Sequence, residues 1–220
     1  MKICLTIYSS PWSEFAGGGQ IAVHHLACAL QRMGHDVHVL YSKSPGEKIS
    51  AKPPYTVHWT SHFHCATLNL DIFSYYRALK RLMKWERFDI IHGNAEEAFF
   101  ASDIARNFKA GYLFTSHANT ILDKGIVRGM LQPLTFLKNL NNYLLRSSAL
   151  KASRVITFSE FSKKLALKGL RNKKGKRVIV VSPGIDPSWF KTKRQVEGSK
   201  DLVLWGRMEE IGRASCRKRV

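Results

Sequence analysis

The chain has 220 residues, enough for one large domain or two small ones, and 45% of them are hydrophobic, which suffices for a packed core. Its formal net charge is +19 at pH 7. No apolar run approaches the ~20 residues of a membrane span, and the start lacks the layout of a signal peptide, so we expect a cytoplasmic protein. The four cysteines show no paired spacing, which argues against a disulfide framework and a zinc site.

Much of the positive charge lies in two stretches, residues 77–84 and residues 163–177. Such clusters attract the phosphates of nucleic acids, anionic lipid headgroups or sugar nucleotides. A solvated helix face or loop explains any one cluster as simply. Because the chain shows no aromatic–basic RNA-binding motif, we expect no nucleic-acid partner. A peripheral contact with the inner face of an anionic membrane stays open as a hypothesis.

Strand-like and helix-like segments alternate from one end of the chain to the other. Residues 2–8 form a short apolar run typical of a buried strand, and apolar residues at helical spacing follow from Ile21 to Met33. Further strands are expected at residues 36–41, 55–59, 88–92, 112–116, 154–158 and 177–181, and further helices at 71–85, 96–108, from near Pro133 to 151, and 160–170. The alternation predicts an α/β fold with a doubly wound parallel sheet.

A run of glycines, Gly17, Gly18 and Gly19, followed by Gln20, stands between the first strand and the first helix. Residues without a Cβ let a ligand approach the backbone, and the helix N-terminus behind them offers unpaired N–H groups to an anion. The run is not Gly-x-Gly-x-x-Gly, so it does not indicate a nicotinamide or flavin dinucleotide site. A plain tight turn is the alternative interpretation.

Small, polar or protonatable residues also follow the later strands. Ligands of parallel sheets bind at the carboxyl edge, where these strand ends meet, so we predict a binding site there. The histidines of residues 58–64 lack the Asp, Glu or Cys spacing that would complete a metal site. The residues that follow the strands are Gly93 and Asn94, then 117–119, then Ser159, then 183–186.

Six motifs, each weak alone, stand in the order of one family. Residues 1–210 thereby resemble the N-terminal domain of GT-B glycosyltransferases, specifically glycosyltransferase family 4. The motifs are the glycine run with Gln20, the Asp-hydrophobic-hydrophobic-His strand of residues 88–92, Thr115-Ser-His117, residues 152–160, residues 183–186 with Phe190, and residues 202–207, which end in Gly206-Arg207.

The resemblance implies the N-terminal half of a GT-B fold, in which two Rossmann-like domains bind a nucleotide-sugar between them. It implies a retaining glycosyltransferase that uses a nucleotide-diphosphate sugar as donor and a glycan or lipid-linked molecule as acceptor, with no cofactor and no metal. On this basis residues 1–198 are the acceptor-side domain, and residues 199–210 are the first strand of a truncated donor-side domain.

The same resemblance assigns roles to single residues. His117 matches the family histidine near the transferred sugar, although a satisfied loop histidine is the simpler alternative. Pro183 stands where Asn is usual and Ser153 where Asp is frequent, and proline removes an amide donor from its turn. The expected roles are catalytic for His117, donor-binding for Gly17, Gly18, Gly19, Gly184 and Arg207, and acceptor-binding for Gln20 and Asn94.

Residues 211–220 resemble the translation of a sequencing-adapter read, so no chemistry is assigned to Cys216. A genuine basic, disordered terminus is the alternative. Because most of the donor pocket would belong to the second domain, we expect the 220-residue fragment to be inactive. The alternative function is a stand-alone binding module for a phosphorylated glycan or an anionic membrane surface.

Overall fold

The structure is a computed structural model that describes residues 1–14, 16–62, 64–65, 68–69, 71–117, 133–170 and 177–184. The chain divides into two compact units, Met1–Pro183 and Gly184–Val220. The described residues belong to the first unit, apart from Gly184, and the fold below is that of the first unit. The predicted domain limits at residues 198 and 210 and the predicted tail lie outside the described residues.

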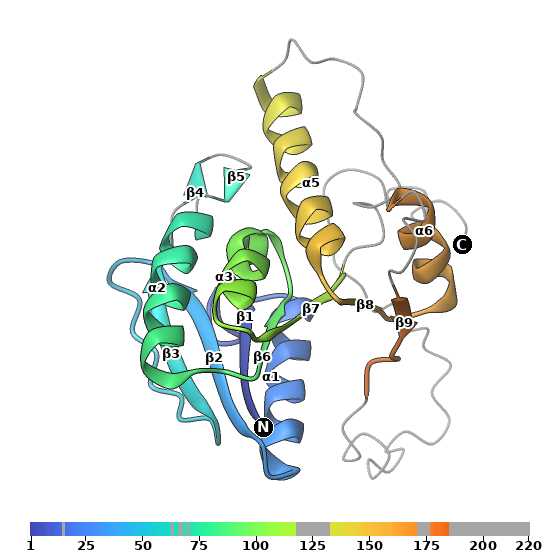
Figure 1. The fold of residues 1–220 in the computed structure, drawn as a ribbon. Helices are drawn as coiled ribbons and strands as arrows, with labels where there is room; N and C mark the ends of the chain where they lie inside the picture. The colour runs from blue at the N-terminus through green and yellow to red at the C-terminus, as the bar shows by residue number, and fades with distance from the viewer. Residues whose placement is uncertain are drawn as a thin grey trace, which may run out of the picture. The chain divides into compact units, whose positions relative to one another are not determined.

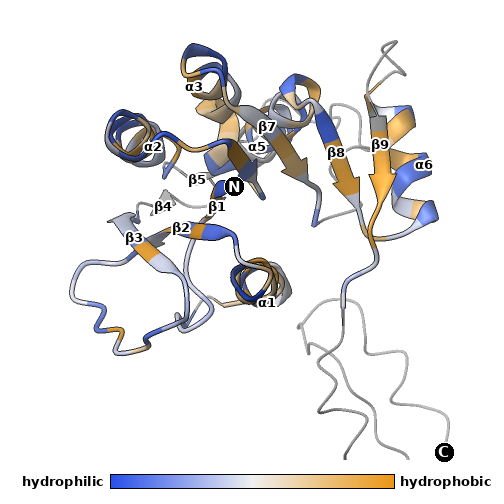
Figure 2. Ribbon diagram, turned by 60° about the horizontal axis from the view of Figure 1, so that its bottom comes forward, coloured by the Kyte–Doolittle hydropathy of each residue, from blue (hydrophilic) through white to orange (hydrophobic). Residues whose placement is uncertain are grey.

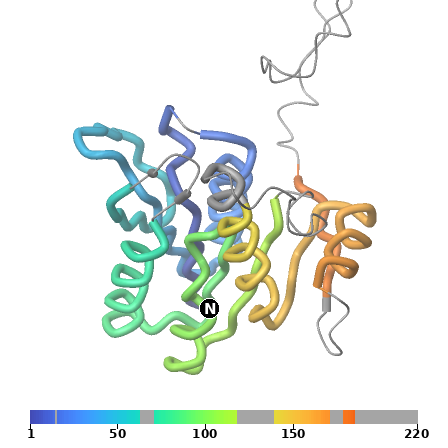
Figure 3. The backbone as a smooth tube through the Cα atoms, turned by 90° about the horizontal axis from the view of Figure 1, so that it is seen from above, coloured from blue at the N-terminus to red at the C-terminus, as the bar shows by residue number. Residues whose placement is uncertain are grey.

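Seven parallel strands form one sheet in the order β3-β2-β1-β6-β7-β8-β9. The chain first builds outward from β1 to β3 and then returns to the other side of β1 with β6. In Figure 3 the colours accordingly run from cyan through blue to green and orange across the first unit. The strands are β1 (Lys2–Ile7), β2 (Asp36–Lys43), β3 (Thr56–Ser61), β6 (Ile90–Gly93), β7 (Gly111–Thr115), β8 (Arg154–Thr157) and β9 (Arg177–Val180), with a separate antiparallel pair, β4 (His64–Cys65) and β5 (Leu68–Asn69).

Helices cover both faces of this sheet (Figures 1 and 2). Alternate side chains of β1 point to opposite faces, as the pleat of a strand requires. Leu5 packs in a core with Val23 of α1, whereas Cys4 packs in a second core with residues of α2, α3 and α5. The predicted doubly wound parallel sheet is therefore confirmed. The helices are α1 (Gly18–Arg32), α2 (Asp71–Glu86), α3 (Ala101–Asn107), α5 (Pro133–Lys151) and α6 (Glu160–Gly169).

Two helix predictions need correction. The helix α1 begins at Gly18, so two of the three glycines form its first turn instead of preceding it. The single helix expected at residues 96–108 is a 3₁₀ turn, η1 (Glu96–Phe100), followed by α3. The turn buries Glu96, Glu97 and Ala98.

No helix in the described part of the chain combines the length and the apolar character needed to cross a lipid bilayer. The surface of the first unit carries several large exposed apolar side chains, two of them, Phe73 and Trp85, on α2.

Candidate functional site

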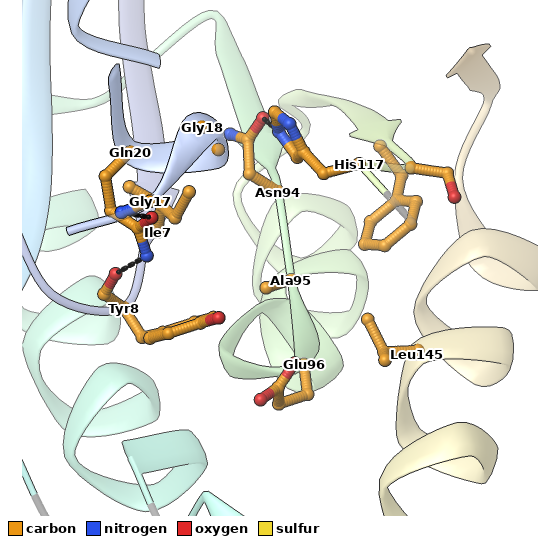
Figure 4. Close-up of a pocket in the computed structure, with 13 residues that line it drawn as sticks. Ile7, Tyr8, Gly17, Gly18, Gln20, Asn94, Ala95, Glu96, His117 and Leu145 are labelled. Carbon is orange, nitrogen blue, oxygen red and sulfur yellow. Dashed lines mark hydrogen bonds between the residues drawn. The ribbon is translucent and has the colours of Figure 1, made fainter. Parts of the chain in front are cut away.

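A cavity of about 230 Å³ opens at the carboxyl ends of the central strands (Figure 4). It lies where the strand order reverses between β1 and β6, the place at which open α/β sheets bind ligands. Six of the eight predicted site residues line it. The lining residues are Ile7, Tyr8, Gly17, Gly18, Gly19, Gln20, Asn94, Ala95, Glu96, Phe114, Ser116, His117 and Leu145.

The side chain of Gln20 holds the glycine loop against the end of β1. Its Oε1 accepts a hydrogen bond from the backbone N–H of Gly17 at 3.0 Å, and its Nε2 donates to the carbonyl of Tyr8 at 3.0 Å (Figure 4). Gln20 is buried, and it occupies the position from which a capping-box side chain reaches back to the start of a helix. Acceptor binding by Gln20 stays a prediction, and the observed contacts make it a support of the loop.

The glycines at positions 18 and 19 are required neither by their backbone conformation nor by packing. Neither has a positive φ. A Cβ on Gly18 would have no atom within 4 Å, and one on Gly19 would lie 3.6 Å from the ring of His117, an ordinary contact. By contrast, a Cβ on Gly93 would lie 2.3 Å from that of Ala98. The missing side chains at Gly18 and Gly19 therefore leave the pocket open beside two N–H groups that have no partner within their helix.

Asn94 and His117 form one hydrogen-bonded unit on the pocket wall. Asn94 Nδ2 donates to the carbonyls of Thr6 at 3.0 Å and of His92 at 3.2 Å. Asn94 Oδ1 lies 3.0 Å from His117 Nε2, and Figure 4 shows the two side chains facing each other. The other ring nitrogen of His117, Nδ1, is on the side of Gly19 and makes no hydrogen bond within the described part of the chain.

Burial lowers the pKa of His117 to about 4. Burial, together with the neighbouring His117, also lowers the pKa of His92 to about 4. His92 Nε2 lies 2.6 Å from Thr115 Oγ1, so this second imidazole is held inside the protein. Both rings are neutral at pH 7, and His117 meets the pocket as a neutral imidazole.

Two carboxyl side chains that the sequence analysis missed, those of Glu96 and Glu97, follow Asn94 two and three residues later. Glu96 lines the pocket. Glu97 is 2% exposed, and its Oε1 accepts from Thr6 Oγ1 at 3.0 Å and from the Ala95 N–H at 3.3 Å. Its Oε2 has no hydrogen-bond partner among the residues that the structure describes. Burial, reinforced by the charge of Glu96, raises the pKa of Glu97 to about 8. The sequence signal that could have revealed them is a pair of adjacent glutamates soon after the end of a strand.

Ser159, which also follows a strand, does not line the pocket. Ser159 caps α6, where its Oγ accepts from the Ser162 N–H at 3.1 Å. Gly184 is exposed and begins the second unit, and Arg207 lies outside the described residues. Leu145 reaches the pocket from α5, and no local sequence signal places it there.

His58 and His62 are engaged in hydrogen bonds. His58 Nε2 lies 2.8 Å from His38 Nδ1, and His62 Nδ1 lies 2.6 Å from Asp71 Oδ2. Across the described ranges, no three His, Cys, Asp or Glu side chains are grouped so as to hold a metal ion.

The family model of Glycosyltransferase Family 4 matches residues 16–189, a span that contains the glycine loop, Asn94 and His117. The chain belongs to this glycosyltransferase family. The resemblance inferred from the motifs is thereby confirmed. No curated protein matches the sequence of this family 4 domain.

Solved structures share the fold of this glycosyltransferase domain at low sequence identity. Sucrose-phosphate synthase from Thermosynechococcus elongatus matches with a TM-score of 0.65 and 17% identity, over 85% of this chain and 49% of that one. Anabaena HepE, solved with UDP and glucose, matches with a TM-score of 0.54 and 16% identity, over 86% of this chain and 46% of that one. UDP-GlcNAc 2-epimerase from Methanocaldococcus jannaschii matches with a TM-score of 0.53 and 13% identity, over 82% of this chain and 45% of that one.

At these identities the likeness shows the fold alone. It confirms the Rossmann-like half of a GT-B fold as the architecture of the family 4 domain. The chain spans about half the length of these three structures.

Proposed function

We propose that this domain is the acceptor-side half of a retaining glycosyltransferase that transfers a sugar from a nucleotide-diphosphate sugar to a glycan or lipid-linked acceptor. The observation that carries the proposal is the pocket at the point of strand reversal. There, the N–H groups of Gly18 and Gly19, which have no partner within α1, and His117 Nδ1, which has no hydrogen-bond partner among the described residues, border one space. Membership in family 4 supports transfer as the reaction, and the complex of HepE with UDP and glucose supports a nucleotide-sugar as the donor.

The glycine end of the pocket suits the leaving group. A departing nucleoside diphosphate gains negative charge as the sugar bond breaks, and fixed N–H donors stabilise such charge. The first turn of α1 offers the N–H groups of Gly18 and Gly19, and the dipole of the helix favours an anion at the same place. The absence of a Cβ lets phosphate oxygens come close to this backbone. Gly17, Gly184 and Arg207 are proposed to add contacts to the donor.

The histidine end suits the sugar. The transition state resembles an oxocarbenium ion, so positive charge develops on the sugar ring. A neutral imidazole tolerates that charge better than an imidazolium, and the lowered pKa of His117 keeps it neutral. Its Nδ1 can accept a hydrogen bond from a sugar hydroxyl. His117 thus orients the reacting sugar without supplying a cation, and the proposal needs neither a metal nor a further cofactor.

The experiment is to incubate the protein that carries both domains with UDP-, ADP- and GDP-sugars and to measure release of the nucleoside diphosphate. Slow transfer of the sugar to water also releases the nucleoside diphosphate, so the acceptor need not be known. We expect release from at least one donor, and none from residues 1–220 alone, because the second domain is proposed to hold most of the donor. Failure of every donor would contradict the proposed function. Release by residues 1–220 would contradict the division of the site between two domains.

A second candidate function, contact with an anionic membrane surface, is favoured by the outer face of α2. The Trp85 side chain is 81% exposed and that of Phe73 is 56% exposed. The opposite face of the helix is buried, so these aromatic rings share the solvent side with the cations. Interfacial helices combine features of this kind, and each cation near an anionic surface contributes about 1 kcal/mol. The exposed cations of this face are Arg77, Lys80, Arg81 and Lys84.

This contact fits an enzyme with a lipid-linked acceptor and also a stand-alone binding module. It is tested by sedimentation of the chain with vesicles of phosphatidylserine and phosphatidylcholine. The double variant Arg81→Glu, Lys84→Glu should bind several-fold less than Lys164→Glu, Lys168→Glu on the exposed side of α6, although the change in charge is the same. Equal losses, or no binding by the unmodified chain, would exclude the α2 face as the contact.

A further inference from the structure

We propose that Asn94 is a positioning residue that fixes His117 as the tautomer with hydrogen on Nε2, and so keeps Nδ1 as a bare acceptor for a hydroxyl of the ligand. The identity of the ligand rests on the proposed function. The tautomer itself follows from hydrogen bonds within the domain.

The orientation of the Asn94 amide is determined by its neighbours. Two carbonyl oxygens, those of Thr6 and His92, lie 3.0 and 3.2 Å from Nδ2. Carbonyl oxygens only accept hydrogen bonds, so the NH₂ group must face them. The reversed amide would bring Oδ1 against both carbonyls, at a site where Asn94 is 3% exposed and water cannot compensate. Oδ1 is therefore the atom that faces His117.

The orientation of the amide in turn determines which nitrogen of the His117 ring carries the hydrogen. Asn94 Oδ1 can only accept, so His117 Nε2, at 3.0 Å, must carry a hydrogen. In a neutral imidazole the other nitrogen then has a lone pair and no hydrogen. Because both donors and the acceptor of the Asn94 amide are used in this way, its contribution to the pocket is the state of His117.

Further hydrogen bonds hold the backbone next to Asn94 in place. Thr6, whose carbonyl accepts from Asn94, also donates its hydroxyl to Glu97 Oε1 at 3.0 Å. The same carboxyl oxygen accepts from the N–H of Ala95, the next residue in the chain, at 3.3 Å. Glu97 thus joins the end of β1 to the turn that follows β6. The side chain that sets the tautomer is held by both central strands.

Gly19 keeps the bare nitrogen accessible. A Cβ at this position would lie 3.6 Å from His117 Nδ1, in van der Waals contact, and a larger side chain would fill the space in front of it. A bare nitrogen accepts from hydroxyl or amide groups and repels phosphate oxygens. The pocket therefore has two chemically different ends, N–H donors for an anion at Gly18 and Gly19, and an acceptor for a sugar hydroxyl at His117.

The test is the two-bond ¹H–¹⁵N spectrum of the imidazoles in the ¹⁵N-labelled chain at pH 7, with His117 assigned through His117→Gln. We expect one tautomer, with hydrogen on Nε2, whereas the exposed His25 averages between both. In Asn94→Leu the exchange of the Nε2 hydrogen with water should become about tenfold faster, as expected for the loss of one hydrogen bond.

The matched control is Thr115→Val, which removes the hydrogen bond of the neighbouring His92 and should leave the His117 signals unchanged. A mixture of tautomers, or hydrogen on Nδ1, in the unmodified chain would overturn the proposal, as would unchanged exchange in Asn94→Leu. If Asn94→Leu does not fold, the spectrum of the unmodified chain still decides. No donor or acceptor is present in this experiment, so its failure is distinct from a failure of the proposed transfer.

Discussion

Hydrogen-bonded histidines lie at both ends of the parallel sheet, but only the carboxyl end forms the pocket at the strand reversal. At the amino end, His38 Nδ1 lies 2.8 Å from His58 Nε2, and His38 Nε2 lies 3.1 Å from Asp36 Oδ1. Both ring nitrogens of His38 are thus used within the protein. At the carboxyl end, His117 uses one nitrogen for Asn94 and presents the other to the pocket.

Shifted pKa values do not separate the two ends. Burial lowers the pKa of His38 and His58 just as it lowers the pKa of His92 and His117. The carboxyl end differs in three other respects: a cavity, an acceptor atom without a partner among the described residues, and glycines that packing does not require. Together these features indicate a binding site, whereas buried histidines alone indicate only a satisfied polar cluster.

The largest change in stability is expected for Gly93→Ala. The added Cβ would lie 2.3 Å from that of Ala98, so η1 or β6 must shift. Overpacking of this kind costs about 3 kcal/mol in the free energy of unfolding. Urea unfolding followed by circular dichroism measures this loss.

Gly18→Ala is the matched control at the same edge of the sheet. Its Cβ would meet no atom within 4 Å, and alanine is the better helix former, so the free energy of unfolding should change by less than about 1 kcal/mol. The same substitution should weaken binding of a nucleoside diphosphate in the protein with both domains. A large loss of stability in Gly18→Ala would show that the loop glycines serve packing after all.

A pH-dependent effect distinguishes the buried carboxyl of Glu97 from the carboxylate of Glu86 at the amino end. Burial raises the pKa of Glu97 from 4.5 to about 8, so the folded state binds its proton more tightly than the unfolded state. Its contribution to stability is complete below pH 4.5 and is lost as the pH rises to about 8.

Urea unfolding at several pH values tests whether stability falls, as predicted, when the pH rises. Glu97→Gln cannot titrate and should lack that decrease between pH 4.5 and 8. Glu86→Gln should retain it, because the ion pair with Lys2 lowers the pKa of Glu86. If the free energy of unfolding falls equally with pH in both variants, other groups cause the decrease.

The sequence predicted which residues meet, because carboxyl ends of parallel strands share one edge. The glycine loop, Asn94 and His117 follow different strands and line one pocket, as that rule requires. It did not predict that Asn94 and Gln20 turn their amides toward the protein, because such contacts depend on single atoms. Leu145 was missed because it arrives on a helix far along the chain.

The burial of Glu97 was missed for a related reason. Two adjacent glutamates look like an exposed helix start, and the split of residues 96–108 into a 3₁₀ turn and α3 turns them inward. Local patterns of charge cannot reveal a turn of this kind, because it depends on the close approach of Ala98 to Gly93.

The most direct test of the account compares His117→Ala with His58→Ala in the protein that carries both domains, by release of nucleoside diphosphate from its preferred nucleotide-sugar. We predict that kcat falls about 100-fold in His117→Ala, with the fold intact by circular dichroism, and changes less than twofold in His58→Ala. Similar rates for His117→Ala and the unmodified protein would contradict the assignment of the pocket as the reacting site and would make His117 a structural loop histidine.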